Sequence, residues 1–209
     1  YPVVSETNPE CRALRMLRDA ADDAVCDALE LSAFNAESLA RKFPASEAWK
    51  HAAIVTGTNF GGMSAAETAL VDGRNDPSKA SLNSYLFGAA GTTLAHRYAF
   101  TGPRLNLSLS CASGTAAIGL AFDMIRFGRA DVALACGYDE LSLFIYAGLS
   151  ALRAITPETI RPFDRRRRGT LFSEGAGVLI LESAAHAAAR GRMPYAKVLG
   201  RAMNNDGYH

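Results

Sequence analysis

Cys111 is the residue of this sequence whose type and setting point most directly to chemistry. It follows residues 105–110, in which apolar and polar side chains alternate with period two, a pattern that predicts a β-strand. Small residues at 112–119 lead into an apolar series of helical spacing that runs to Phe127, with Gly128 as a stop signal. The thiol is therefore predicted at a turn from strand to helix. Because a helix N-terminus favours the thiolate, this cysteine can attack a thioester and accept its acyl group.

Packing alone is the competing interpretation, since cysteine is among the residue types that proteins bury most often. The neighbours favour the catalytic interpretation. Ala112, Ser113 and Gly114 are small enough to let a thioester approach the sulfur, and Ser110 and Ala112 are expected to support the nucleophile on either side.

The surrounding sequence predicts an α/β domain whose sheet is covered by helices on both faces, because strand and helix patterns alternate along the chain. The expected helices cover residues 9–31, 36–42, 61–71, 83–98, 112–127 and 183–190, with a mixed helical region at 141–152. The expected strands cover residues 52–57, 104–110, 131–137, 177–181 and 196–202, and the expected loops cover 72–77 and 156–170.

Composition excludes several classes of function. The 209 residues carry a formal net charge of +1, so no nucleic-acid partner is predicted. The sequence contains no run of 18 apolar residues, so no membrane span is predicted either. The cysteines show no metal-binding spacing, so we expect no metal and no cofactor. Reduced thiols favour a cytoplasmic location. The four cysteines are Cys11, Cys26, Cys111 and Cys136.

Several motifs follow one another between residues 81 and 209. They are YAFTGP at 98–103, SCASG at 110–114, GRADVALACGYDE at 128–140, ALR at 151–153 with RPFD at 161–164, EGAGVLILE at 174–182 with HA at 186–187 and ARG at 189–191, and DGYH at 206–209. In this order they resemble the N-terminal half of the β-ketoacyl synthases, the condensing enzymes of fatty-acid and polyketide synthesis.

The resemblance implies the thiolase fold, with this chain as roughly the first half of an α-β-α-β-α layered sandwich. Measured against the family, residues 1–209 form the N-terminal domain without its first strand and without the C-terminal half, which carries two catalytic histidines and a lysine. It further implies that Cys111 accepts an acyl group from an acyl carrier protein. A malonyl thioester on the carrier then loses carbon dioxide and attacks the acyl-cysteine in a Claisen condensation.

The resemblance also assigns supporting roles. The N–H of Cys111 is expected to stabilise the oxyanion, with helix capping as its competing role. Glu174 is expected to organise the site behind the nucleophile. The alternative role is a helix cap or a buried ion pair with an arginine of the run 165–168. That run could meet an acidic carrier protein, although a solvated loop is the favoured interpretation. None of the histidines matches a catalytic motif; they are His51, His96, His186 and His209.

The resemblance implies that residues 104–110 pair with their symmetry mate in a homodimer. The strand alternates cleanly and has few charges to protect an edge, which favours the same expectation. The competing interpretation makes it a central strand of its own sheet.

Three departures from the family pattern bear on function. The departures are RRGT at 167–170, Ser173, and Leu149 after Gly148. In the family these positions lie near the acyl pocket. They leave two alternatives open. One is a non-condensing partner subunit that binds acyl carrier protein, and the other is a thiolase-like enzyme acting on coenzyme A esters.

Overall fold

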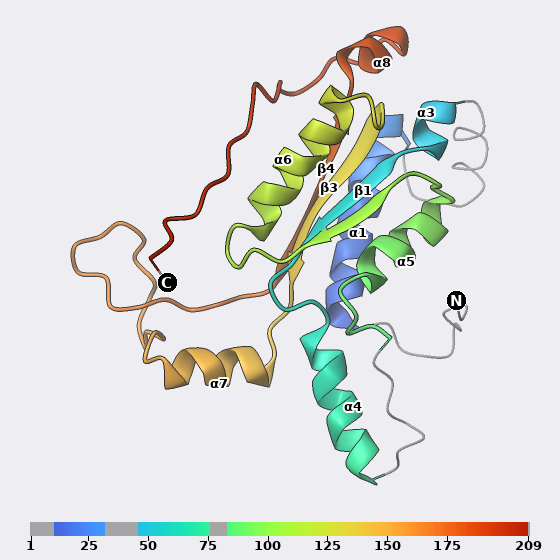
Figure 1. The fold of residues 1–209 in the computed structure, drawn as a ribbon. Coiled ribbons are helices and arrows are strands. Elements are labelled where there is room, and N and C mark those ends of the chain that lie inside the picture. Colours follow the sequence, from blue (N-terminus) through green and yellow to red (C-terminus); the bar gives the residue numbers. More distant parts are fainter. Residues whose placement is uncertain (1–10, 32–45, 76–82, 209) are drawn as a thin grey trace.

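The computed structural model describes residues 11–31, 46–75 and 83–208. The helices are α1 (Arg12–Leu29), α3 (Glu47–Lys50), α4 (Met63–Asn75), α5 (Ala89–Tyr98), α6 (Ser113–Arg126), α7 (Leu143–Ala151) and α8 (Ala184–Ala189). The strands are β1 (Ala53–Gly57), β2 (Arg104–Leu107), β3 (Val132–Asp139) and β4 (Gly175–Glu182). Strands and helices alternate along most of the chain, so the prediction of an α/β class is confirmed (Figure 1).

The four strands form one mixed sheet in the order β2-β1-β3-β4. β1 lies parallel to both β2 and β3, whereas β4 lies antiparallel to β3, with Ala133 opposite Leu181. The carboxyl ends of β1, β2 and β3 therefore meet at one end of the sheet. β2 forms an edge of this sheet, which excludes the interpretation of residues 104–110 as a central strand within the described part of the chain.

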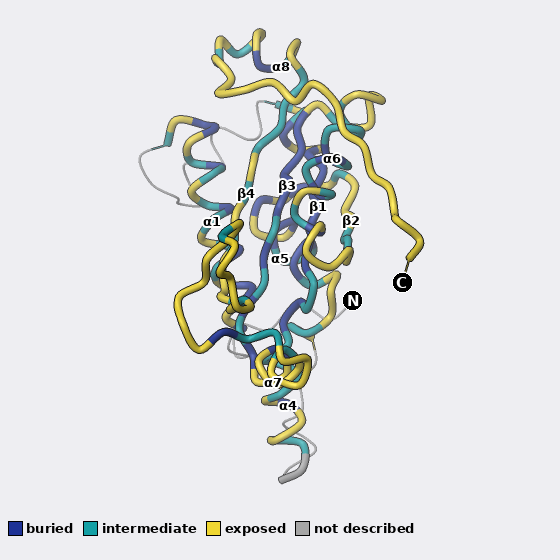
Figure 2. The backbone as a smooth tube through the Cα atoms, turned by 90° about the vertical axis from the view of Figure 1, so that its left-hand side faces the viewer, coloured by how far each residue is buried: buried dark blue, intermediate teal, exposed yellow. Residues whose placement is uncertain are grey.

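Helices cover both faces of the sheet. α1 and α5 pack on one face around Leu17, Ile54, Leu94 and Leu134, which are at most 1% exposed. α6 packs on the opposite face, where the buried contacts are mainly alanines of the helix and of the two central strands. Small side chains let α6 lie close to the sheet, and Figure 2 shows the resulting buried centre in β1 and β3.

Several elements differ in length from the expectation, α4, α5 and β2 among them. α4 continues to Asn75, because a glycine within a helix, here Gly73, costs only about 1 kcal/mol and does not end it. α5 begins at Ala89 rather than at residue 83, after a series of turns. β2 ends at Leu107, because the chain turns sharply before α6 and Ser110 adopts a φ of +51°.

The predicted strand at 196–202 is wrong, because this segment is irregular in the structure. A strand needs a hydrogen-bonded neighbour, and the described sheet ends at β2 and β4. The segment instead runs beside α6 (Figure 1), where Arg201 forms an ion pair with Asp123. The loop at 156–170 is confirmed, with a single bridge between Ile155 and Thr170. The predicted helix at 36–42 lies outside the described residues.

Candidate active site

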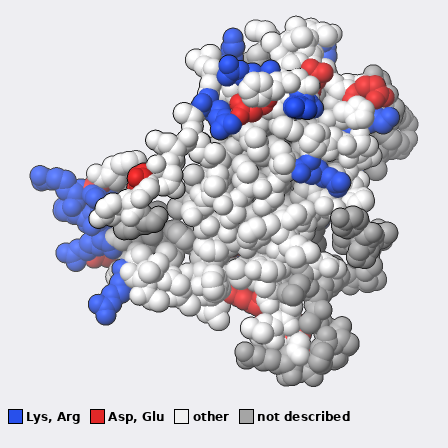
Figure 3. All heavy atoms as spheres, viewed as in Figure 1, with Lys and Arg blue, Asp and Glu red and all other residues white. Residues whose placement is uncertain are grey.

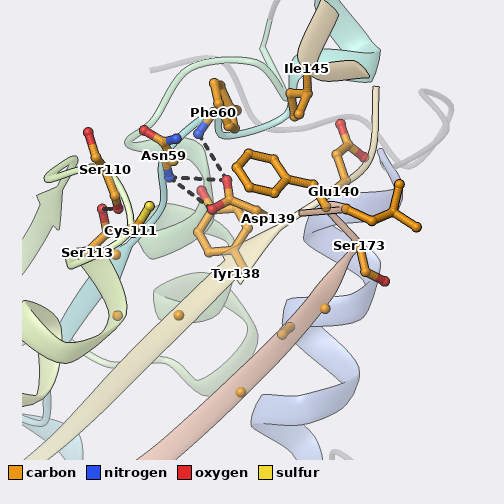
Figure 4. A pocket seen from close by; sticks show the side chains of 18 residues that line it. Asn59, Phe60, Ser110, Cys111, Ser113, Tyr138, Asp139, Glu140, Ile145 and Ser173 are labelled. Atoms are coloured by element: carbon orange, nitrogen blue, oxygen red, sulfur yellow. Dashed lines mark hydrogen bonds between the residues drawn. The ribbon is translucent and has the colours of Figure 1, made fainter. Parts of the chain in front are cut away.

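Cys111 lies in the turn between β2 and α6 and is exposed, as the sequence predicts for a nucleophile. It lines a cavity of about 440 Å³ at the carboxyl ends of the parallel strands. Figure 4 shows this cavity with Cys111 and Ser110 on one side and the end of β3 on the other. The remaining wall comes from α7, from residues 171–173 and from the start of β4.

Ser113 holds the turn that carries Cys111, the predicted nucleophile. Its hydroxyl accepts a hydrogen bond from the N–H of Leu109 at 2.8 Å and donates one to the carbonyl oxygen of Ser110 at 2.7 Å. The side chain is only 3% exposed. These two bonds fix Ser110 in its left-handed conformation and hold Cys111 at the rim of the cavity.

Two glycines bring the N-terminus of α6 against the sheet. A Cβ atom on Gly57, the last residue of β1, would lie 2.3 Å from the carbonyl oxygen of Ser113, which no real side chain could tolerate. A Cβ on Gly137 of β3 would lie 3.4 Å from the Cα of Gly114. The nucleophile turn therefore rests directly on the ends of β1 and β3.

Glu140 is a buried carboxylate that sequence reasoning did not single out as a site residue. It is 1% exposed and lines the cavity. Its two oxygens accept hydrogen bonds from the N–H of Ala13 at 2.9 Å and from the N–H of Ser64 at 2.8 Å. These donors lie in the first turns of α1 and α4, so the negative charge joins the positive ends of two helices behind the cavity.

Asp139, which precedes Glu140, also lines the cavity and was not predicted as a site residue. Its carboxylate accepts hydrogen bonds from the hydroxyl of Thr58 and from the N–H groups of Asn59 and Phe60. The sequence feature that could have identified both acids as site residues is their position at the end of a buried strand, in GYDE at 137–140.

The predicted supporting residues do not all lie at the cavity. Ser110 lines the cavity, and Ala112 is the N-cap residue of α6. Glu174 is not among the residues that line the cavity. Its carboxylate forms an ion pair with the Nε of Arg12 at 2.8 Å and accepts a hydrogen bond from the N–H of Leu141 at 3.1 Å. The partner is therefore Arg12 and not an arginine of the run 165–168.

None of the histidines in the described part of the chain lines this cavity. His51 is exposed and contacts Thr101, His96 is exposed on α5, and His186 is hydrogen-bonded to Glu182 at 2.7 Å. His209 lies outside the described residues.

The arginine run forms an exposed loop between α7 and β4, where Figure 3 shows Lys and Arg side chains gathered. A second hollow, of about 450 Å³, is surrounded by Glu158, Arg161 and residues 165–168. Asp164 stabilises the loop by accepting a hydrogen bond from the N–H of Arg166 at 2.7 Å.

Two kinds of feature are absent from the described residues. No helix there has the length and apolar character needed to cross a bilayer. No group of three or more His, Cys, Asp and Glu side chains there is arranged to hold a metal ion.

Comparison with known proteins places this site in a family. The family model described as the β-ketoacyl synthase N-terminal domain matches residues 10–187. Nodulation protein E of Rhizobium leguminosarum bv. trifolii is 45% identical over 108 residues, which cover 51% of this chain and 27% of that protein. 3-Oxoacyl-[acyl-carrier-protein] synthase 2 of Vibrio cholerae is 32% identical over 169 residues, which cover 75% of this chain and 40% of that protein.

A solved structure with a similar fold is a type II PKS acyl-carrier protein in complex with its ketosynthase. It matches with a TM-score of 0.74 and 28% identity, and the match covers 89% of this chain and 47% of that one. The chain spans less than half the length of each of these relatives. Since the family model covers most of the described residues, including the nucleophile turn, the chain belongs to the β-ketoacyl synthase family as its N-terminal domain.

Proposed function

We propose that the protein is a β-ketoacyl synthase that forms an acyl-cysteine at Cys111 and condenses it with malonyl-carrier-protein. The observation that carries this proposal is the exposed thiol on the turn before α6, at the rim of a cavity large enough for part of an acyl chain. The named function of the Vibrio cholerae relative supports the same chemistry.

The first step is acyl transfer. The thiolate of Cys111 attacks the thioester carbonyl, and a bond forms between sulfur and carbon while the carbonyl oxygen gains negative charge. The N–H of Cys111, at the start of α6, is the proposed donor to this oxyanion. Collapse of the intermediate breaks the original carbon–sulfur bond, and the carrier leaves as a thiolate, which takes up the proton that the Cys111 thiol lost on ionisation.

The second step is decarboxylative condensation. The malonyl thioester loses carbon dioxide, and the resulting enolate attacks the acyl-cysteine, which releases the Cys111 thiolate. In the family two histidines stabilise the enolate oxygen, and the resemblance assigns them to the second half of the fold. Glu140 and the two helix N-termini that it joins would keep the floor of the cavity rigid during both steps.

We infer acyl carrier protein and a second copy of the chain as partners. The ketosynthase of similar fold was solved with its acyl-carrier protein, which supports the first. The edge that β2 forms in the described sheet supports the second, because such an edge is usually covered. The cytoplasmic location stays a prediction from the cysteines.

The test is to incubate the purified protein with an acyl-carrier thioester and to measure its intact mass. We expect one added acyl group on wild type, mapped to Cys111, and none on Cys111→Ala. A protein that contains both halves of the fold should then discharge the acyl group as a β-ketoacyl product when malonyl-carrier-protein is added, whereas residues 1–209 alone should not condense it. Acylation without condensation in a protein that contains both halves would favour the non-condensing partner subunit, and a lack of acylation would overturn the proposal.

A further inference from the structure

Asp139 links the end of β3 to the turn that follows β1. Its Oδ1 accepts hydrogen bonds from the hydroxyl of Thr58 at 2.8 Å, from the N–H of Asn59 at 3.1 Å and from the N–H of Phe60 at 2.9 Å. The Oδ2 lies 3.1 Å from the same Asn59 nitrogen. The hydroxyl of Thr58 also accepts from the N–H of Gly61 at 2.8 Å. One carboxylate therefore fixes the conformation of four consecutive residues.

This turn presents the side chain of Asn59 to the cavity. Asn59 and Cys111 line the same hollow, and Figure 4 draws Asn59 between the nucleophile turn and Asp139. Its backbone N–H is bound to Asp139. Its side-chain amide has no hydrogen-bond partner among the residues that the structure describes. The amide is thus a donor and an acceptor available to whatever fills the cavity.

An acyl chain on Cys111 would cover this amide. A chain made only of methylene groups would remove water from the amide without replacing its hydrogen bonds, which is unfavourable. A chain with an oxygen close to the thioester would restore one of them. Sites built around a hydrogen-bonding group discriminate against ligands that lack the partner.

We propose that Asn59 is a specificity-determining residue that favours acyl groups oxygenated near the thioester, and that Asp139 is the positioning residue that presents it. This inference rests on the proposed acyl transfer to Cys111. Asp139 acts through the turn and does not itself touch the acyl chain, since its carboxylate is engaged by three donors.

The test compares two soluble substrates of equal length, the N-acetylcysteamine thioesters of hexanoate and 3-oxohexanoate. In each reaction the acyl carbon gains a bond to the sulfur of Cys111 and loses its bond to N-acetylcysteamine, which leaves as the thiol. The initial rate of mass increase of the purified protein is measured for both. We expect wild type to prefer the oxygenated chain by about tenfold.

Asn59→Leu keeps the size of the side chain and removes its polar atoms, so the preference should fall to about one. Asn59→Gln keeps an amide and should retain a preference. Asp139→Ala should lose the preference as Asn59→Leu does. If its circular dichroism shows an unfolded protein, Asp139→Asn serves instead, with a partial loss. Labelling of Cys111 by iodoacetamide should be unchanged in Asn59→Leu, because that reagent does not use the amide.

The matched control is Asp164→Ala, which removes another loop-stabilising carboxylate outside the cavity and should keep the wild-type preference. Equal rates for both thioesters in wild type, or a preference that survives Asn59→Leu, would overturn the role of Asn59. A preference that survives both Asp139 variants would overturn the role of Asp139. Absence of any acylation would overturn the proposed function and this inference with it, whereas acylation with unchanged ratios overturns the inference alone.

Discussion

At the scale of single residues, the four cysteines differ by environment. Cys111 is exposed, Cys26 is half-buried, and Cys11 and Cys136 are buried. Burial raises the pKa of the Cys136 thiol to about 12. Burial, together with the charges of Asp22 and Asp23, also raises the pKa of Cys26. Since the thiolate is the reactive species, the raised pKa values make Cys26 and Cys136 less reactive toward electrophiles.

We predict that limited iodoacetamide alkylates Cys111 first, at a rate at least about a hundredfold above that of Cys136 at pH 8. Peptide mapping by mass spectrometry measures the four rates. Unfolding the protein in urea provides the control, because the rates should then converge. Equal labelling of Cys111 and Cys136 in the folded protein would contradict the assignment of the nucleophile.

At the scale of elements, the position of α6 depends on Gly57, which has no side chain. Gly57→Ala would place a Cβ atom 2.3 Å from the carbonyl oxygen of Ser113, so α6 must shift away from β1. We expect a loss of about 1–3 kcal/mol in the free energy of unfolding, measured by urea denaturation, and slower alkylation of Cys111.

Gly148→Ala is the matched control for this substitution. A Cβ atom on Gly148 meets no atom within 4 Å, and the residue is exposed within α7. Since alanine is the better helix former, this variant should be as stable as wild type or up to about 1 kcal/mol more stable. Equal stability of the two variants would show that the contact at Gly57 does not position α6.

A second element-scale contact joins β4, α8 and α1. Arg190 donates to Glu182 through Nε at 2.8 Å and to the carbonyl oxygen of Ala28 at 2.8 Å, and His186 is hydrogen-bonded to the same carboxylate. Burial acts to raise the pKa of Glu182, but the hydrogen bonds from Arg190 and His186 prevail and lower it below 4.5.

A lowered pKa means that the folded protein favours the ionised carboxylate. The stabilisation is therefore complete above pH 4.5, the ordinary value, and is lost as the pH falls through the pKa of the folded state. We predict that Glu182→Gln lowers the free energy of unfolding by about 2 kcal/mol at pH 7 and by progressively less below pH 4.5. Urea denaturation at a series of pH values measures this difference, and a constant difference down to pH 2 would contradict it.

At the scale of the whole molecule, the described surface leaves a strand edge and several large apolar side chains uncovered. β2 ends the sheet, and the carbonyl oxygen of Leu107 accepts from the N–H of Thr58. Because backbone groups in a parallel pair face the neighbour at alternate residues, Arg104 and Asn106 direct theirs to the open edge. Several large apolar side chains are exposed; they include Leu143 and Phe144 on α7, Leu152 directly after it, Leu171 before β4 and Leu199 in the irregular segment 196–202.

We predict that wild type is a dimer and that Arg104→Pro shifts it to a monomer, because proline removes an N–H from the open edge without touching the pairing with β1. Light scattering measures the mass, and circular dichroism confirms folding. Lys197→Pro, in the exposed irregular segment, is the control and should stay dimeric. A monomeric wild type, or a folded Arg104→Pro dimer, would contradict an interface built on β2.

The sequence by itself determined the class of fold and the place of Cys111 within it. Period-two alternation before Cys111 and helical spacing after it are local patterns, and they placed the thiol at a strand-to-helix turn that the structure confirms. The order of motifs also indicated the β-ketoacyl synthase family, which the family model confirms over residues 10–187.

Only the tertiary structure decided which distant residues meet at the cavity. Asn59 and Asp139 are 80 positions apart, and their contact depends on the pairing of β1 with β3. Glu174 pairs with Arg12 because α1 packs beside β4, a neighbour that no local pattern identifies. Residues 196–202 carry an apolar pattern but have no strand to pair with in the described sheet. Periodicity is encoded locally, whereas hydrogen-bond partners are set by packing between elements far apart in the chain.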